Sequence, residues 1–437
     1  MVAPESRSLR IHLQGEFHLT QLSIARITVR TVVLCTLSAL AAAPAAAVTR
    51  RAFVTSVTGT GNLSSWAGAT GATALDKADS ICRARAAAAT LPNPTTYRAW
   101  LSTSTTDAYC HVQGLTGKKA TGCGGGVQPG GGPWYLSNGI TPFSASLAEL
   151  TGPEKVIYRP ILLDENGDEP DFAAGNYWTG TDADGIADPA TCLGWTSADV
   201  LESGMRGNSQ SSAYGWTGSS WYDCNDTLRL LCFEPGASQP FNLGWSPAAL
   251  AFVSSATGQG DLSAWPQAGG ATGLAAGDNV CRNLAAAAHL PAPESFVAWL
   301  SDGGHDARDR VTLDAPFRRV DHYPIANSHA DLIDGFAVNS LHVDEHGSYA
   351  SIPYGTQTGT YGDGTKTPDR CFGWTTNSAA FFGTFGGQDL ARSERWTEGF
   401  ANTCDNLRRI YCFANVVTVF WDGFESSGTA RWSATVP

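Results

Sequence analysis

The chain has 437 residues, which is too long for one ordinary hydrophobic core and favours two or three domains. Its hydrophobic content of 43% and aromatic content of 10% are typical of globular proteins, and its 48 glycines favour many loops. The net charge of −12 argues against a nucleic-acid or polyanion binder, because phosphate affinity depends on clustered Lys and Arg.

The first 47 residues have the pattern of a secretory signal. Arg26 and Arg30 precede the short apolar run TVVLCTLSALAAA, and Ala45–Ala47 supply a small-residue cleavage site. The run, which includes Cys35, is too short for a membrane span, and no other stretch is apolar enough. We predict a signal peptide at 1–47, no transmembrane segment, and a mature protein that is secreted or located at the cell surface or in the periplasm.

The rest of the chain contains two copies of one sequence pattern. ADSICRARAAAATLPNPTTYRAWLS, at Ala78–Ser102, returns as GDNVCRNLAAAAHLPAPESFVAWLS at Gly277–Ser301. CLGWT at Cys192 returns as CFGWT at Cys371, but at a smaller offset. The first copy therefore has about twenty extra residues between these two blocks.

The repeat divides the chain into five parts. We predict a signal peptide at 1–47, a first domain at 52–235, a Pro- and Gly-containing linker at 236–250, a second domain at 251–414 and a C-terminal tail at 415–437. The tail resembles a short motif that ends many exported bacterial proteins.

Each copy mixes helical and strand patterns. Helical spacing of Leu75, Ala78, Cys82, Ala86 and Ala89 predicts an amphipathic helix, and the second copy repeats it less cleanly. The aromatic-x-Ala-Trp-Leu segments and the segments around the last cysteine of each copy are typical of strands. The predicted fold class is α+β with many irregular loops.

Ten cysteines remain after the signal peptide, and an even number in an exported protein predicts disulfides. Four occur in both copies: Cys82, Cys192, Cys224 and Cys232, then Cys281, Cys371, Cys404 and Cys412. Zinc is the alternative, but neither the cysteine spacing nor the histidines supply a ligand set common to both copies. Four cysteines allow three pairings, which spacing alone does not decide.

One argument favours a particular pairing in the first copy. Cys82 belongs to the first helix and Cys232 to the closing strand, so a bond between them would join the two ends of the domain. Cys192 would then pair with Cys224, and Cys110 with Cys123 inside the extra segment.

These residues resemble the endostatin-like domain at the end of collagens XV and XVIII, a member of the C-type lectin-like superfamily. The resemblance rests on A-D-x-x-C at Ala78, on the aromatic-x-Ala-Trp-Leu-Ser strands, on WTGTDADG from Trp178, on C-x2-W at Cys192, and on the final C-x7-C. It covers nearly all of both copies, and bacterial secreted versions are the most similar.

The resemblance implies two tandem C-type lectin-like domains with nested disulfides, and a non-enzymatic binding or adhesion function. The implied partner is an extracellular protein or carbohydrate, and no cofactor is expected. Two family properties do not carry over. The arginine-rich heparin face is missing from these acidic copies, and neither copy begins with the histidines that hold zinc in endostatin.

Candidate site residues are few. We predict structural roles for Trp100, Trp195, Trp299 and Trp374, which occupy equivalent positions in the two copies, and ligand contacts for tryptophans in loop-like surroundings: Trp66, Trp134, Trp221 and Trp265. Asp182, Asp184 and Asp188 are weak calcium candidates, for which solvated turns are the alternative.

Catalytic motifs are missing from the sequence, which predicts that the protein is not an enzyme. The alternative is a secreted hydrolase with its site around His111 in the first copy. In either case we expect function to lie in the loops between Trp100 and Cys192, where the two copies differ most.

Overall fold

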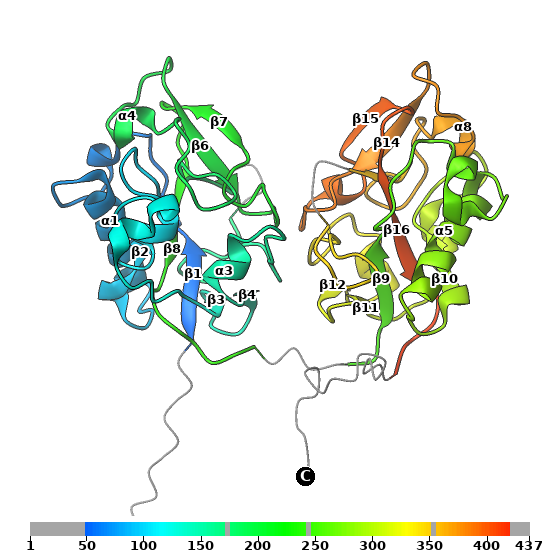
Figure 1. The fold of residues 1–437 in the computed structure, drawn as a ribbon, viewed down its shortest axis with the longest axis horizontal. Coiled ribbons are helices and arrows are strands. Elements are labelled where there is room, and N and C mark those ends of the chain that lie inside the picture. The colour runs from blue at the N-terminus through cyan, green and yellow to red at the C-terminus, as the bar shows by residue number, and fades with distance from the viewer. Residues whose placement is uncertain (1–48, 171–174, 242–245, 351–354, 420–437) are drawn as a thin grey trace, which may run out of the picture. The chain divides into compact units, whose positions relative to one another are not determined.

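We describe a computed structural model of the chain, which covers residues 49–170, 175–241, 246–350 and 355–419. Within these residues the protein is mixed α and β, with two similar eight-stranded sheets (Figure 1). One sheet is built from Arg50–Phe233, the first repeat, and the other from Ala249–Ala414, the second repeat. The predicted signal peptide and most of the predicted tail lie outside the described residues.

The helices and strands follow the same order in both repeats. In the first repeat they are β1 (Arg50–Val54), α1 (Ala74–Ala88), β2 (Arg98–Ala99), α2 (Ala108–His111), β3 (Trp134–Leu136), β4 (Pro142–Ser144), α3 (Leu147–Leu150), β5 (Asn176–Trp178), α4 (Cys192–Trp195), β6 (Ser203–Asn208), β7 (Ser220–Asp223) and β8 (Arg229–Phe233). In the second they are β9 (Ala249–Val253), α5 (Gly273–Ala287), β10 (Phe296–Ala298), α6 (Ala307–Arg310), β11 (Phe317–Arg319), β12 (Pro324–Ala326), α7 (His329–Leu332), β13 (Thr356–Gln357), α8 (Cys371–Trp374), β14 (Phe382–Gly386), β15 (Phe400–Thr403) and β16 (Arg409–Ala414).

The first and last strands of each repeat pair with each other in the middle of the sheet. The orders are β4-β3-β1-β8-β5-β6-β7 with β2 on β8, and β12-β11-β9-β16-β13-β14-β15 with β10 on β16. The central pairs are antiparallel, with Phe53 opposite Cys232 and Phe252 opposite Cys412. Because the ends of each repeat are fixed at the centre, the loops between them can differ without changing the sheet.

The first helix of each repeat is joined to the next strand by a carboxylate. α1 begins at a capping box between Thr73 and Asp76, and its buried face confirms the predicted amphipathic helix. Asp79 on this helix accepts a hydrogen bond of 2.9 Å from the backbone N–H of Ala99. Asp278 on α5 accepts the equivalent bond from Ala298, also at 2.9 Å.

All five disulfides join the cysteines that the sequence predicts. Cys82–Cys232 and Cys281–Cys412 connect the first helix to the last strand of each repeat. Nested within them are Cys192–Cys224 and Cys371–Cys404. The fifth bond, Cys110–Cys123, closes the segment that only the first repeat has.

The tryptophans at equivalent positions fill the cores, as predicted: Trp100, Trp195, Trp299 and Trp374 are all buried. Trp100 and Trp299 each donate an indole hydrogen bond to a buried threonine, at 2.7 and 2.9 Å. Large aromatic rings with satisfied N–H groups explain how repeats with short strands and many loops hold a rigid core.

Candidate functional site

The four-residue elements α4 and α8 have left-handed backbones. The φ angles are 48, 51, 68 and 67° in Cys192–Trp195, and 45, 53, 69 and 66° in Cys371–Trp374. Only the third residue of each turn is glycine. A left-handed conformation costs roughly 1–2 kcal/mol for each other residue, so the surrounding structure must hold both turns in place.

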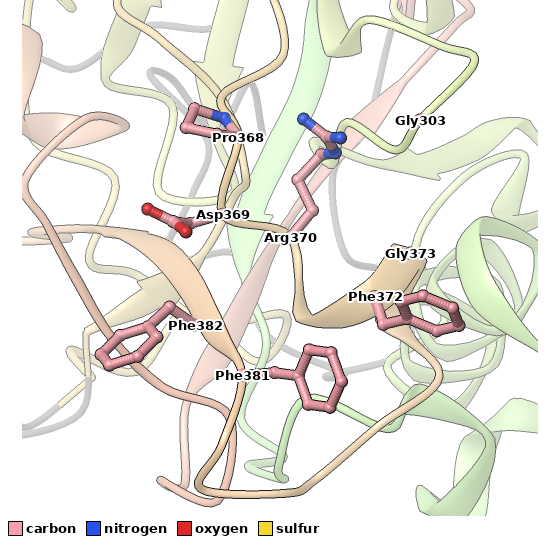
Figure 2. Close-up of a pocket in the computed structure, with 8 residues that line it drawn as sticks. All are labelled: Gly303, Pro368, Asp369, Arg370, Phe372, Gly373, Phe381 and Phe382. Carbon is pink, nitrogen blue, oxygen red and sulfur yellow. The ribbon is translucent and has the colours of Figure 1, made fainter.

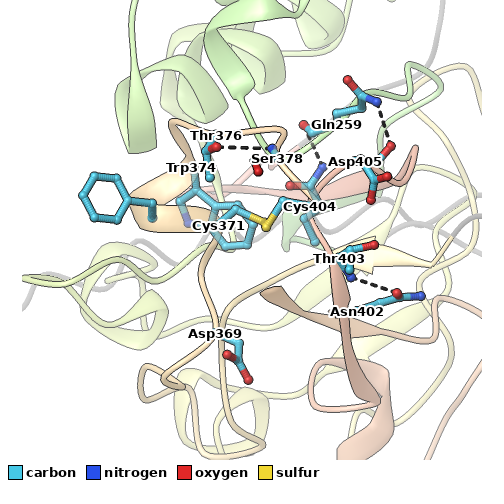
Figure 3. The surroundings of a disulfide bond; sticks show 12 residues. Gln259, Asp369, Cys371, Trp374, Thr376, Ser378, Asn402, Thr403, Cys404 and Asp405 are labelled. Carbon is cyan, nitrogen blue, oxygen red and sulfur yellow. Dashed lines mark hydrogen bonds between the residues drawn. A yellow bond between two sulfur atoms is a disulfide. The ribbon is translucent and has the colours of Figure 1, made fainter. Parts of the chain in front are cut away.

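In the second repeat, the residues at both ends of the left-handed turn hold it. Cys371 is bonded to Cys404 beside β15 (Figure 3). Trp374 donates an indole hydrogen bond of 2.7 Å to the carbonyl of Ser301. Gly260 lies against this disulfide, because a Cβ there would be 2.6 Å from the Cys371 Sγ. The disulfide therefore holds the first residue of the turn, and the indole hydrogen bond holds the last.

The first repeat uses the same three contacts. Cys192 pairs with Cys224, and Trp195 donates a hydrogen bond of 2.7 Å to the carbonyl of Ser102. A Cβ on Gly61 would be 2.3 Å from the Cys192 Sγ. The strained turn is thus a shared feature of the scaffold.

The second residue of each turn is apolar and points into solvent. Leu193 is 64% exposed and Phe372 is 75% exposed, although the cysteine and the tryptophan at the two ends of each turn are buried. Residues with a strained backbone cluster at functional sites. An apolar side chain that a strained turn exposes to solvent does not contribute to core packing. The turn therefore marks a candidate contact surface in both repeats.

Other exposed apolar residues lie near the turn in each repeat. They are Val200, Leu201 and Trp221 in the first repeat, and Phe381, Phe382 and Phe400 in the second. We call the left-handed turn, the two-stranded hairpin of β6 and β7 or of β14 and β15, and the segment joining them the loop end of each repeat. Figure 1 shows α4 beside β6 and β7, and α8 near β14 and β15.

The loop end of the second repeat contains a pocket of about 480 Å³. Figure 2 shows its lining, which comes from the turn, from the segment before it, from the start of β14 and from one glycine loop: Gly303, Pro368, Asp369, Arg370, Phe372, Gly373, Phe381 and Phe382. The rings of Phe372 and Phe381 are tilted, with centroids 5.7 Å apart. The size is within the range of small-ligand sites.

Two opposite charges accompany these rings. Asp369 and Arg370 are adjacent and half-buried. The backbone of Asp369 is fixed, since its carbonyl accepts a hydrogen bond of 2.9 Å from Thr384. Within the described residues, neither its carboxylate nor the Arg370 guanidinium forms an ion pair or a side-chain hydrogen bond. Both groups are thus available to a ligand.

The first repeat lacks this set of side chains. Thr191 pairs with Gly204 as Arg370 pairs with Gly383, so the two segments align residue by residue. The counterparts of the pocket residues Asp369, Arg370, Phe372, Phe381 and Phe382 are Ala190, Thr191, Leu193, Glu202 and Ser203. The shared turn therefore carries a charged aromatic pocket in one repeat only.

The tryptophans proposed as ligand contacts are mostly buried. Trp66, Trp134 and Trp265 lie in the interior and donate indole hydrogen bonds to backbone carbonyls at 2.8, 2.9 and 3.0 Å. The prediction that they lie at a surface is therefore wrong. The loop glycines Gly59 and Gly258 lie against the rings of Trp66 and Trp265, and Trp134 lies on β3 with its ring against Phe233. Trp221 on β7 is 61% exposed and lies at the loop end of the first repeat.

Two of the three calcium candidates have other partners. Asp184 forms an ion pair with Lys155, and Asp188 accepts a hydrogen bond from the Ala190 N–H at 2.7 Å. Burial raises the pKa of Asp182, and the carboxylates of Asp188 and Asp184 raise it further. Across the part of the chain that the structure describes, no three acidic, His or Cys side chains gather as a metal site would require. Calcium binding here stays a prediction.

His111, on which the hydrolase alternative depends, is buried in the first repeat. Its Nε2 lies 2.8 Å from the Asp79 carboxylate, which also receives Arg83 and Arg98. The neighbouring Cys110 is in a disulfide and therefore supplies no nucleophile. The contacts give His111 a structural role beside α1, and the hydrolase alternative stays a prediction.

The pocket residues were not among the sequence candidates. A signal was present, because alignment of PATCLGW with PDRCFGW shows Asp, Arg and Phe in the second copy where the first has Ala, Thr and Leu. No protein-family model matches this chain, and no curated protein matches it significantly. None of the helices in the described residues has the length and hydropathy needed to cross a membrane.

Proposed function

We propose that the protein is a secreted, non-enzymatic binding or adhesion protein. It consists of two tandem endostatin-like domains of the C-type lectin-like type and contacts extracellular protein or glycan ligands through its loop ends. The observation that carries the proposal is the left-handed turn, which in both repeats holds one apolar side chain in solvent. Five disulfides support an oxidising, extracellular environment.

The tandem arrangement supports adhesion rather than catalysis. Each loop end exposes a few apolar residues, which suits a weak contact with a ligand. Once one repeat has bound, the linked second repeat is held at a high effective concentration near its own ligand site. The exposed apolar residues are the kind of anchor that supplies most of the affinity at a protein surface. Trp221 is the largest of these anchors in the first repeat, and Phe372 is the most exposed of those in the second.

The test is a binding screen with the full chain against immobilised matrix proteins and glycans, in the presence and absence of calcium. Phe372→Ser is compared with Ile140→Ser, because Ile140 is also exposed but lies in the turn between β3 and β4. For a ligand of the second repeat, we expect Phe372→Ser to weaken binding at least tenfold, since burying a phenylalanine contributes about 2 kcal/mol. Ile140→Ser should leave binding unchanged.

Leu193→Ser provides the corresponding test for a ligand of the first repeat. The proposal fails if the chain binds nothing above a serum albumin control. It also fails if every interaction survives both loop-end substitutions in protein that keeps its circular dichroism spectrum.

A further inference from the structure

We propose that the pocket of the second repeat binds a zwitterionic group that joins an organic ammonium to a phosphate, as phosphocholine does. This inference rests on the proposed function, because it assigns a ligand class to the loop end of the second repeat. It is carried by Asp369 and Arg370, which are unpaired within the described residues, and by the three phenylalanine rings that line the same pocket.

The first step concerns the charges. Asp369 and Arg370 have lost part of their hydration to the surrounding chain, and within the described residues no protein group pairs with either. A ligand that carries one positive and one negative group would pair with both. The phosphate would accept charge-assisted hydrogen bonds from Arg370, which are about twice as strong as neutral ones, and the ammonium, which has no N–H, would be held near Asp369 by charge attraction. A ligand with a single charge would leave one of the two side chains without a partner.

The second step places the ammonium. The Asp369 carboxylate points to the side of the pocket on which Phe382 lies (Figure 2). An organic cation there would face the carboxylate and the phenylalanine ring together, which is how proteins bind quaternary ammonium groups. Methyl groups on the nitrogen also suit the Phe382 ring, which has no polar atoms.

The third step places the phosphate. The guanidinium of Arg370 points away from Asp369, toward the loop of Gly303 (Figure 2). A planar guanidinium presents paired N–H donors that match two phosphate oxygens. The space beside it is open, since a Cβ on Gly303 would meet no heavy atom within 4 Å.

The lining is less suited to an uncharged sugar. A sugar ring presents many hydroxyl groups, each of which needs donors and acceptors, but the side chains here offer one carboxylate, one guanidinium and three hydrocarbon rings. The net charge of −12 also disfavours a ligand that is only anionic. A zwitterion avoids both difficulties.

The experiment is calorimetric titration of the full chain with phosphocholine, with choline and with inorganic phosphate. We expect phosphocholine to bind at least tenfold more tightly than either half. Asp369→Asn should weaken phosphocholine about tenfold and remove any choline binding. Arg370→Gln should weaken phosphocholine about tenfold and leave choline unchanged.

The matched control is Glu202→Gln, which neutralises a carboxylate at the loop end of the first repeat, at the position equivalent to Phe381. It should change none of these affinities. A second arm uses phosphatidylcholine vesicles. Binding to vesicles identifies a lipid headgroup as the source, and binding to soluble phosphocholine alone identifies a phosphocholine-bearing conjugate; both support the pocket.

The inference is overturned if phosphocholine does not bind at millimolar concentration, or if choline or phosphate alone binds as tightly. It is also overturned if Glu202→Gln weakens binding as much as Asp369→Asn. If phosphocholine fails while an immobilised ligand still depends on Phe372, the proposed function stands and only the ligand class is wrong. If no binding of any kind depends on Phe372, the role of the second loop end in the proposed function fails as well.

Discussion

The two repeats share a scaffold and differ in what it carries. The same strand order, the same nested disulfides and the same left-handed turn occur in both. At the loop end, however, the first repeat has Leu193, Val200, Leu201 and Trp221 exposed, and the second has a pocket with three phenylalanines and two charges. The difference shows that the buried cysteine and tryptophan hold the turn in both repeats, while the exposed residue of the turn and its neighbours differ between them.

The comparison also separates two ways of varying one domain. The first repeat has an extra segment with its own disulfide, Cys110–Cys123, and a buried His111. The second repeat has no such segment and instead replaces side chains on an unchanged turn. Substitutions on and beside a fixed turn can create a site without inserting residues. The pocket therefore cannot be found by comparing the lengths of the two copies.

The largest effect we predict tests whether the two turns are equally important to stability. Replacing Cys192 and Cys224 by alanine, or Cys371 and Cys404 by alanine, opens loops with sequence separations of 32 and 33 residues. The chain-entropy relation gives a loss of about 3–4 kcal/mol in unfolding free energy for each pair. Urea unfolding followed by tryptophan fluorescence measures it, and losses that differ severalfold would break the equivalence of the turns.

A second prediction uses the carboxylate that joins the first helix to the next strand. Among the described residues, Asp278 forms an ion pair with Arg310 alone, whereas Asp79 pairs with Arg83, Arg98 and His111. Arg310→Gln should therefore lower the unfolding free energy by about 2–3 kcal/mol, because the half-buried carboxylate loses its charged partner. His111→Gln should cost about 1 kcal/mol or less, because two arginines remain.

The same urea experiment checks both variants, and equal losses would contradict the difference in partners. His111→Gln also tests the alternative function. A hydrolytic activity that depends on pH and disappears in this variant would support the hydrolase over the binding protein.

A third prediction concerns acid stability. Burial and the nearby Arg319 lower the pKa of His342 to about 3, although Asp321 acts in the opposite direction. The unfolded chain, with a pKa near 6.5, then binds the proton more readily, so this stabilisation is complete above pH 6.5 and is lost as the pH falls toward 3. From pH 7 to pH 5 the loss is about 2 kcal/mol.

The first repeat has Leu162 at the position of His342, so it should not share this sensitivity. His342→Leu should therefore remove the acid-dependent part from unfolding curves recorded at pH 7 and pH 5. A pH dependence that persists in this variant would assign the effect to other groups.

Much of the scaffold could be predicted from the sequence, because its signals are local or repeated. The helix around Cys82 has a clear periodicity, and the offset between the two copies identified equivalent cysteines and the core residues Trp100 and Trp299. The elements that carry the cysteines favoured Cys82–Cys232, and the other pairs followed from the cysteines that remained and from the equivalence of the two copies. These features depend on core residues and disulfide cysteines, which the same fold requires in both repeats.

The surface could not be predicted in the same way. Trp66, Trp134 and Trp265 lie in loop-like sequence, yet their rings are buried, Trp66 and Trp265 under loop backbone and Trp134 on strand β3. Phe372 lies between a buried Cys371 and a glycine, where sequence favours an interior position, and only the left-handed turn directs it outward. Whether a side chain is exposed depends on tertiary packing and on the left-handed backbone conformation of the turn. Neither can be recognised from the neighbouring residues in the sequence.

The most direct test of the account converts the pocket of the second repeat to the sequence of the first. The full chain carries Asp369→Ala, Arg370→Thr, Phe372→Leu, Phe381→Glu and Phe382→Ser, and its affinity for a ligand of the second repeat is measured beside its urea midpoint. We predict that affinity falls more than tenfold while the midpoint is unchanged, since the first repeat keeps the same turn with these residues. Binding that survives this exchange would contradict the assignment of the site to this pocket.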